Sequence, residues 1–483
     1  MGKQKKKSIN QNEKVSKMPS HKRHQLNNLA EILLKKCTEL GTTKEEWKDY
    51  EEIYNNVQTI RDIEKEYNVT LPNRDDKWEN FLSWCSDAGA NFETIDIKKL
   101  KDEEYGLVSK QLLNEGDVVL KVPRKLMMTT TAISEPILNN FVKKDPILQH
   151  MPNVVLALHL MNEYVNPDSF WKPYLSILPA EYNTVLYFTP EDLKELTGSP
   201  VKEECMKMYR NIARQYSYFY RQFQQCPELR SSPLRHYFTY DFYRWAVSTV
   251  MTRQNAVPSA DGNNFISALI PLWDMANHIN GKISTDYNVK ENCLECMAMK
   301  NFLKDEEVYI FYGARKNAEF FIHNGFVYPE NQHDATSLKF GISKNDPLFS
   351  LKSQLCSELN IPISGSYYLH CGKKPIDEKL LSFLKILVMN EDELKKWLEM
   401  KDKLTEFNNP ERESEITVSE AMKYFETRIS LLLKLYNSNI EEDEKLLVSS
   451  ELLPRRKMIL QLRCLEKKIL QNALIYAADY KNL

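Results

Sequence analysis

The sequence lacks a membrane-spanning run and an apolar signal core. No stretch reaches the roughly 18 apolar residues that a membrane-spanning helix requires. Residues 1–20 are polar and basic, unlike a secretory signal. The nine cysteines, an odd number, favour reduced thiols over a disulfide framework. We therefore expect a cytoplasmic protein with no membrane partner, and the Lys3–Lys7 run leaves open a nuclear fraction.

A basic excess is also missing. Lysine and arginine total 65 against 67 aspartates and glutamates, which gives a formal net charge of -2. A general nucleic-acid binder needs a positive excess, so we expect no nucleic-acid partner. No fixed-period internal repeat is visible. Hydrophobic residues make up 42% of the 483 positions, enough for real cores in about two to four domains. We expect a monomer.

Two strand-rich stretches flank a helical one. Strand-like runs occur at Thr94–Ile97, Gly106–Ser109 and Val118–Val122, and again between Ala268 and Tyr312. Between them, residues from about 132 to 250 are rich in aromatics, nearly free of glycine and helical in period. A connection of that length inside a compact domain needs structure of its own. The pattern predicts a β-rich domain over residues 73–325 that is split by a helical insertion.

The two ends of the chain have their own patterns. Residues 1–24 predict a disordered basic tail, and residues 25–72 predict two helices, because apolar side chains recur at helical spacing. Residues 335–483 carry helix-period apolar residues with charged partners, and they predict an all-helical C-terminal domain. The predicted fold class is therefore α+β.

Three short segments carry unusual polar groups. In Leu269–His278 an apolar run ends in polar side chains, which need partners if they are buried. The other two are Glu306–Gly313, which ends in a tyrosine and a glycine, and Met251–Asn255, which closes the helical stretch. Each also has an ordinary interpretation: a capped turn, an aromatic strand before a glycine turn, and a helix end with a favourable cation.

Taken together and in this order, the segments resemble the SET-domain protein methyltransferases. The pairs Asn277-His278 and Tyr312-Gly313, about 35 residues apart, are that family's signature. Phe170–Tyr174, the long insertion and the helical C-terminal region look like the subgroup related to Rubisco large-subunit lysine methyltransferase. The run Tyr243–Asn255 and the later Trp273–Met275 are similar to the actin-histidine N-methyltransferase type. The resemblance spans about residues 25–480.

The resemblance implies S-adenosyl-L-methionine as cofactor and a pseudoknot that brings the two signature pairs together. Arg253 suits the cofactor carboxylate as a bidentate cation. Many SET domains carry Gly-x-Gly in the first cofactor loop, whereas this chain has Glu104 and then only Gly106. That departure leaves the contacts of this loop open. The expected cofactor-binding residues are Arg74, Glu103, Glu104, Tyr105, Arg253, Asp274, Met275, Ala276, Asn277, His278 and Asn324.

The resemblance also implies a protein substrate, actin, methylated on the tele nitrogen of a histidine. Lysine, with a pKa of about 10.4, must lose a proton before attack, whereas histidine is mostly neutral at pH 7. The expected catalytic residues are Tyr312, which lines the transfer channel, and Asn255, which fixes the histidine tautomer. The expected substrate-binding residues are Trp273, Gln254, Ile310 and Arg315, the last with a plain surface cation as its alternative.

Two other functions stay open at this stage. A protein-lysine methyltransferase of the same architecture is the nearest alternative, and a non-catalytic adaptor that kept the fold is the second. A metal enzyme is not expected. Cys293 and Cys296 have metal-type spacing, but a structural zinc site needs four ligands and the sequence holds no second Cys-x-x-Cys pair.

Overall fold

The computed structural model describes residues 18–39, 45–71, 73–100, 104–409, 414–448 and 452–480. Contacts divide the chain into two compact units, Met1–Tyr182 with Met206–Phe311 and Asn183–Cys205 with Tyr312–Leu483. The first 17 residues of the predicted tail, with the Lys3–Lys7 run, lie outside the described residues, and helix α1 begins at Ser20. The predicted domain boundaries stay predictions.

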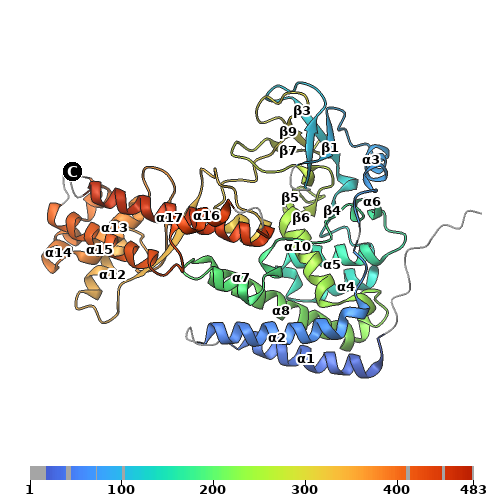
Figure 1. Ribbon diagram of the computed structural model, residues 1–483, viewed down its shortest axis with the longest axis horizontal. Helices are drawn as coiled ribbons and strands as arrows, with labels where there is room; N and C mark the ends of the chain where they lie inside the picture. Colours follow the sequence, from blue (N-terminus) through green and yellow to red (C-terminus); the bar gives the residue numbers. More distant parts are fainter. Residues whose placement is uncertain are drawn as a thin grey trace, which may run out of the picture. The chain divides into compact units, whose positions relative to one another are not determined.

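The first unit contains small sheets together with helices, most of which lie on one side of the sheets (Figure 1). Its helices are α1 (Ser20–Thr38), α2 (Glu46–Glu64), α3 (Trp78–Asp87), α4 (Pro136–Lys144), α5 (Pro152–Val165), α6 (Lys172–Leu175), most of α8 (Val201–Gln225), α9 (Leu234–Tyr237) and α10 (Tyr240–Arg253). Its strands are β1 (Ile95–Lys99), β2 (Tyr105–Ser109), β3 (Val118–Pro123), β4 (Met128–Thr129), β5 (Asn255–Pro258), β6 (Phe265–Leu269), β7 (Thr285–Asn288), β8 (Cys293–Met297) and β9 (Glu307–Val308).

Strands from both sides of the helical stretch pair with one another. The described strands of this unit form antiparallel sheets in the orders β1-β2-β9, β3-β8-β7 and β4-β6-β5. Every one of these sheets therefore joins strands that are distant in the sequence, which confirms the mixed α+β fold class. The strand-like stretch expected up to Tyr312 is shorter than predicted, because only Glu307 and Val308 pair with β2 before the chain turns away.

The helices of the first unit bury a large aromatic and aliphatic core. Helices α5 and α10 pack against each other, and α5 is buried from Val154 to Glu163. Trp245 of α10 is fully buried and stacks on Phe242 at a ring distance of 5.7 Å. Helices α1 and α2 lie side by side, and α2 ends in the buried Glu64. No described helix combines the length and the apolarity that crossing a bilayer would need.

The second unit is mainly helical but not entirely so. Its elements are α7 (Pro190–Glu195), α11 (Asn317–Glu319), the π-helical turn η8 (Phe320–Asn324), β10 (Ala335–Gly341), α12 (Phe349–Glu358), β11 (Ser364–His370), α13 (Glu378–Val388), α14 (Glu391–Glu399), the 3-10 turn η9 (Lys401–Glu406), α15 (Glu415–Leu433), α16 (Ile440–Leu447) and α17 (Pro454–Tyr480).

The expectation of an all-helical C-terminal region is wrong for one hairpin. Strands β10 and β11 pair in antiparallel register from Ala335 opposite His370 to Gly341 opposite Ser364. Leu338 and Phe340 of β10 enter the core of this unit while Lys339 between them is exposed. This period of two is typical of a half-buried strand, but in β10 the clear alternation covers only Leu338 to Phe340.

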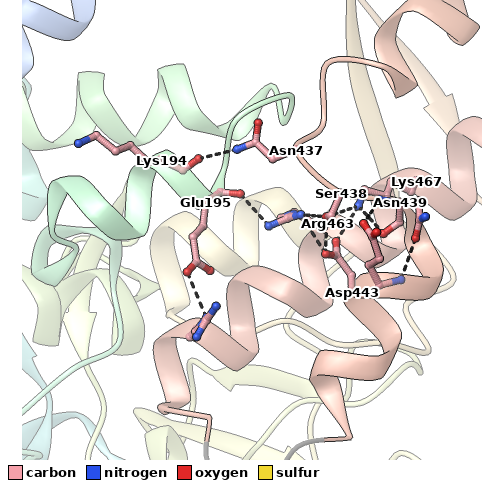
Figure 2. A network of polar contacts seen from close by, with 10 residues as sticks. Lys194, Glu195, Asn437, Ser438, Asn439, Asp443, Arg463 and Lys467 are labelled. Carbon is pink, nitrogen blue, oxygen red and sulfur yellow. Dashed lines mark hydrogen bonds and ion pairs between the residues drawn. The ribbon is translucent and has the colours of Figure 1, made fainter.

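A buried polar network holds the last two helices of this unit together. Asp443 of α16 lies between Arg463 and Lys467 of α17, with O–N distances of 2.9 and 2.7 Å (Figure 2). Arg463 also donates to the main-chain oxygen of Glu195, the last residue of α7, at 3.1 Å. A cation is favourable at a helix C-terminus. Helix α7 thus packs in the second unit, although the sequence places it inside the predicted insertion.

Candidate functional site

The site is built around a strained turn that follows β6. Leu272, fully buried, has φ 70° and ψ -55°, which is a rare γ-turn conformation for a residue with a side chain. The 3-10 turn η7 (Trp273–Met275) follows directly, and the amide of Asp274 donates to the oxygen of Ile270 at 3.1 Å. This compact reversal turns the polar residues of the segment inward instead of letting the strand continue.

The segment with the Asn277-His278 pair meets the segment that leads to Tyr312. The amide of Ile310 donates to the oxygen of Asn277 at 2.9 Å, and His278 forms an isolated parallel bridge with Ile310. The His278 ring stacks on Phe311 at 5.7 Å. Tyr312 follows Phe311 directly and begins the second segment, Tyr312–Leu483, of the other compact unit. The predicted convergence of the two segments is therefore confirmed as far as Phe311.

The Asn277 side chain is oriented by a carboxylate. Its Nδ2 donates to Glu307 Oε1 at 2.7 Å, and Glu307 Oε2 accepts from the Tyr309 hydroxyl at 2.7 Å. A carboxylate accepts but cannot donate, so this bond assigns Nδ2 to Glu307 and leaves Oδ1 of Asn277 for another donor.

Glycine at position 106 makes this arrangement possible. A Cβ on Gly106 would lie 2.9 Å from Glu307 Oε1 and 3.0 Å from Asn277 Nδ2. It would also lie 2.6 Å from Cδ1 of Leu100. The glycine is required here by close approach and not by a positive φ. The one glycine that remains in the first predicted cofactor loop therefore lies where Asn277 needs it.

Arg253 and Asp274 form a buried ion pair. Arg253 ends α10, and its Nη1 lies 3.0 Å from the main-chain oxygen and 3.3 Å from Oδ2 of Asp274. The Asp274 side chain has no solvent exposure, and its Oδ2 also accepts from the Tyr174 hydroxyl at 2.6 Å. Oδ1 of Asp274 and Nε of Arg253 are buried with no hydrogen-bond partner among the described residues. Buried polar atoms of this kind mark a place where a ligand can complete the bonding.

A second arginine lies close to this pair. Arg74 lies over the Tyr105 ring at 4.6 Å, and Tyr105 in turn packs on Trp78 at 4.4 Å and donates to Asp75 at 3.1 Å. Burial and the positive charge of Arg253 lower the pKa of Arg74. Among the described residues no carboxylate lies within ion-pair distance of the Arg74 guanidinium. Two adjacent arginines, of which only Arg253 pairs with a carboxylate, favour an anionic ligand.

The remaining predicted cofactor residues are only partly placed by the structure. Glu103 lies outside the described residues, and Glu104 is exposed. Met275 and Ala276 are buried in the turn, and the Met275 sulfur accepts from Arg253 Nη1 at 3.6 Å. Asn324 belongs to the second unit, where its Oδ1 accepts from Arg315 at 3.5 Å.

The predicted substrate residues of the first unit lie along β5 and η7. Asn255 is the first residue of β5, and its Oδ1 accepts the amide of Ala256 at 2.8 Å. Gln254 Oε1 is buried without a described partner. The indole N–H of Trp273 donates to Thr285 at 3.0 Å, which fixes its ring. One lone pair of the Asn255 oxygen is thus already used locally, and the other can still accept a bond.

The cysteine spacing does not produce a metal site. Cys293 and Cys296 are three residues apart on β8, so their side chains point to opposite faces of the strand. Ligand atoms of Glu291, Cys293 and Glu295 do lie within 4.8 Å of one another. Lys121, however, already pairs with both carboxylates at 2.8 and 2.7 Å, which supplies the positive charge that a cation would bring.

Sequence reasoning missed three residues that shape this site. Glu307 lies in the segment Glu306–Gly313 and Tyr174 lies in Phe170–Tyr174, but the sequence assigned neither residue a role in the site. Tyr182, which interacts electrostatically with Arg253 and whose hydroxyl lies 2.8 Å from the Thr249 hydroxyl, carried no signal. Their common feature is a contact with a residue far away in the sequence, which no local motif records.

Comparisons with known proteins agree with this geometry. The chain is 41% identical over 461 residues to an actin-histidine N-methyltransferase of Papio anubis, which covers 93% of this chain and 77% of that protein. It is 40% identical over 465 residues to the Xenopus tropicalis protein of the same name, with coverages of 94% and 79%. The family described as "Rubisco LSMT substrate-binding" matches residues 343–470.

Solved structures show the same fold at lower identity. "Structure of Rubisco LSMT bound to AdoMet" matches with a TM-score of 0.66 at 21% identity, covering 84% of this chain and 92% of that one. "Structure of Rubisco LSMT bound to Sinefungin and Monomethyllysine" matches with a TM-score of 0.67 at 22% identity and the same coverages. The identity and length of the matches, together with the paired segments at Asn277 and Ile310, place this chain in the actin-histidine N-methyltransferase family of SET-domain enzymes.

Proposed function

We propose that this protein transfers a methyl group from S-adenosyl-L-methionine to the tele nitrogen of a histidine in actin. The observation that carries the proposal is the partly buried polar cluster of Arg74, Arg253, Asp274 and Asn277, in a chain 41% identical to actin-histidine N-methyltransferases. The cofactor supplies a methyl carbon activated by a positively charged sulfur. The protein supplies recognition of both partners and their alignment.

The residues present fit such a cofactor. Arg74, Arg253 and Asp274 together carry one excess positive charge, which one ligand carboxylate would neutralise. Asn277 Oδ1, turned away from Glu307, is an acceptor for the ligand ammonium. The unpartnered Nε of Arg253 and Oδ1 of Asp274 supply one further donor and one further acceptor.

For the substrate, we assign Asn255 and Tyr312 the catalytic roles. The Asn255 oxygen accepts the N–H of the histidine nitrogen that does not react, which leaves the lone pair on the tele nitrogen. Tyr312 lines the methyl-transfer channel and orients the attacking nitrogen. Trp273 and Ile310 contact the imidazole ring of the substrate histidine. Gln254 and Arg315 bind the substrate residues that flank this histidine.

The test of the function uses purified protein, intact actin and cofactor with a labelled methyl group. Mass spectrometry of the digested actin is expected to locate one labelled methyl on the tele nitrogen of a histidine. Label on a lysine would instead support the lysine methyltransferase of the same architecture. Absence of label on actin, with cofactor bound, would reject actin as the substrate.

Arg74→Met is expected to weaken binding of S-adenosylhomocysteine by about 10- to 100-fold. This is the usual loss of affinity when a cation that hydrogen-bonds a ligand carboxylate is removed. Isothermal titration calorimetry measures this affinity. Because Arg74 has no described ion-pair partner, the midpoint of thermal unfolding should stay nearly constant. Arg124→Met is the matched control, since Arg124 also lies over a tyrosine ring, Tyr287 at 5.9 Å. Equal losses in both variants would contradict the assignment.

Asn255→Ala is expected to lower kcat/KM for actin by about 10- to 100-fold, because an unpaired substrate N–H costs roughly 1 to 3 kcal/mol. Affinity for S-adenosylhomocysteine should stay within twofold of the wild type. Asn263→Ala, in the exposed turn between β5 and β6, is the control and should change neither quantity. Loss of cofactor affinity in Asn255→Ala would overturn this division of roles.

We also propose that the protein acts as a monomer in the cytoplasm, with a nuclear fraction, and without a nucleic-acid or membrane partner. The balanced charge supports the absence of a nucleic-acid partner. Light scattering after size-exclusion chromatography tests the monomer. Imaging of the tagged full chain tests the location, and an exclusively nuclear or membrane-bound signal would contradict it.

A further inference from the structure

Tyr174 of α6 has no role in the reaction as proposed so far. It is fully buried, and its ring packs near Phe81 of α3 at 6.3 Å. Its hydroxyl nevertheless reaches a residue 100 positions later, donating to Asp274 Oδ2 at 2.6 Å. A buried hydroxyl that forms a short bond to a buried carboxylate does more than fill space, because phenylalanine would fill the same space.

The Tyr174 bond controls both the charge and the direction of the Asp274 carboxylate. Burial raises the pKa of Asp274, whereas Arg253 and then the hydrogen bond from Tyr174 act to lower it. The phenol therefore favours the ionised carboxylate. It also fixes the rotation of the carboxylate, since Oδ2 is held between Tyr174 and Arg253 while Oδ1 stays unpartnered.

Arg253 depends on that carboxylate. Its guanidinium is planar and rigid, so one edge held in place determines where every other N–H points. Nη1 is held by the Asp274 oxygens at 3.0 and 3.3 Å. Nε remains without a described partner. The direction of the free N–H groups is thus set by a chain of contacts that begins at Tyr174.

We infer that Tyr174 is a positioning residue for the cofactor carboxylate: through Asp274 it aligns Arg253 for that group. The inference rests on the proposed function, because it assumes that Arg253 and Arg74 together bind the carboxylate of S-adenosyl-L-methionine. It assigns a role to the Phe170–Tyr174 motif. It also predicts that loss of the Tyr174 hydroxyl weakens only the binding of the amino-acid end of the ligand.

The experiment compares two ligands on Tyr174→Phe and a matched control. S-adenosylhomocysteine carries the amino-acid end, and 5′-methylthioadenosine is the same adenosine thioether without it. The control is Tyr243→Phe, since Tyr243 is equally buried and its hydroxyl also loses one bond, to Gln215 at 2.9 Å. Calorimetry, with competition for the weaker ligand, gives each affinity.

Tyr174→Phe is expected to weaken S-adenosylhomocysteine about tenfold, as expected for one hydrogen bond to a charged group. Affinity for 5′-methylthioadenosine should stay within twofold, and Tyr243→Phe should leave both ligands within twofold. A parallel loss for both ligands in Tyr174→Phe, or no loss for either, would overturn the inference. Failure of the wild-type protein to bind S-adenosylhomocysteine would instead reject the proposed cofactor site.

The pH dependence supplies a second readout that a merely structural role would not move. Asp274 must be ionised to hold Arg253, so affinity for S-adenosylhomocysteine should fall as the pH drops through the pKa of Asp274. Removing the Tyr174 hydroxyl removes an influence that lowers this pKa. The acid limb of the affinity profile is therefore expected to move to higher pH in Tyr174→Phe and to stay in place in Tyr243→Phe. An unmoved limb in Tyr174→Phe contradicts the inference.

Discussion

Asp443→Asn is expected to destabilise the second compact unit by about 3 to 5 kcal/mol, the usual cost of removing one partner from a buried ion pair. Asp443 has no exposed side-chain surface and is the carboxylate that holds both Arg463 and Lys467 (Figure 2). The side chains of these two cations are only 6% and 2% exposed, so water cannot replace the lost charge. Hydrogen exchange in α16 and α17, followed by mass spectrometry, measures the local loss of stability.

Glu444→Gln is the matched control for that substitution. Glu444 is one residue away on the same helix and pairs with Lys468 at 2.8 Å, but both side chains are about half exposed. An exposed pair contributes roughly 0 to 1 kcal/mol, so exchange in this variant should be close to wild type. The double variant Asp443→Asn with Lys467→Met should recover part of the loss, because it removes one of the two unpaired cations. Similar effects of the Asp443 and Glu444 substitutions would contradict the interpretation.

Glu64→Gln is expected to remove a loss of stability that the wild-type protein shows as the pH rises from about 5 to about 9. Burial raises the pKa of Glu64 from 4.5 to about 8, against the hydrogen bonds with Tyr216 and the amide of Tyr240. The unfolded chain is therefore ionised at this position at neutral pH while the folded chain keeps the proton. By linkage, a difference of this size corresponds to roughly 4 to 5 kcal/mol.

The sign of the Glu64 effect follows from which state binds the proton more tightly. Below pH 4.5 the full stabilisation is present, and it is lost progressively as the pH rises through about 8. Glutamine is neutral throughout and can still accept from Tyr240 and donate to Tyr216. Urea unfolding at a series of pH values should show the two proteins alike near pH 5 and Glu64→Gln more stable near pH 9. Parallel curves for the two proteins would contradict a protonated Glu64.

Much of the fold could be predicted because local patterns determine it. Helices α5, α10 and α17 show helical periodicity with clear ends, and the strand-like runs around Gly106 and Val118 became β2 and β3. The hairpin β10–β11 was missed because the alternation of apolar and polar residues in β10 is clear only from Leu338 to Phe340, which is too short to identify a strand. The expected strand up to Tyr312 was too long, since Ile310 pairs with His278 instead of extending β9.

The candidate site likewise contains residues that the sequence could identify and contacts that it could not. The signature pairs at Asn277 and Tyr312, and the helix end at Arg253, are local in the sequence and could be recognised there. Contacts made at a distance could not: Tyr174 bonds a residue 100 positions away, and Asn277 bonds Glu307 30 positions away. Even the role of Gly106 appears only when Asn277 and Glu307 approach it.

The sequence by itself determined the fold class, the positions of most helices and the residue types that could hold a methyl donor. Only the tertiary structure decided which polar groups share protons and charges, that α7 packs with the C-terminal helices, and that Arg253 is held by Asp274, which in turn accepts from Tyr174. The physical reason is that periodicity and capping act over a few residues. The charge and direction of a buried group depend instead on whichever side chains folding brings within about 3 Å of it.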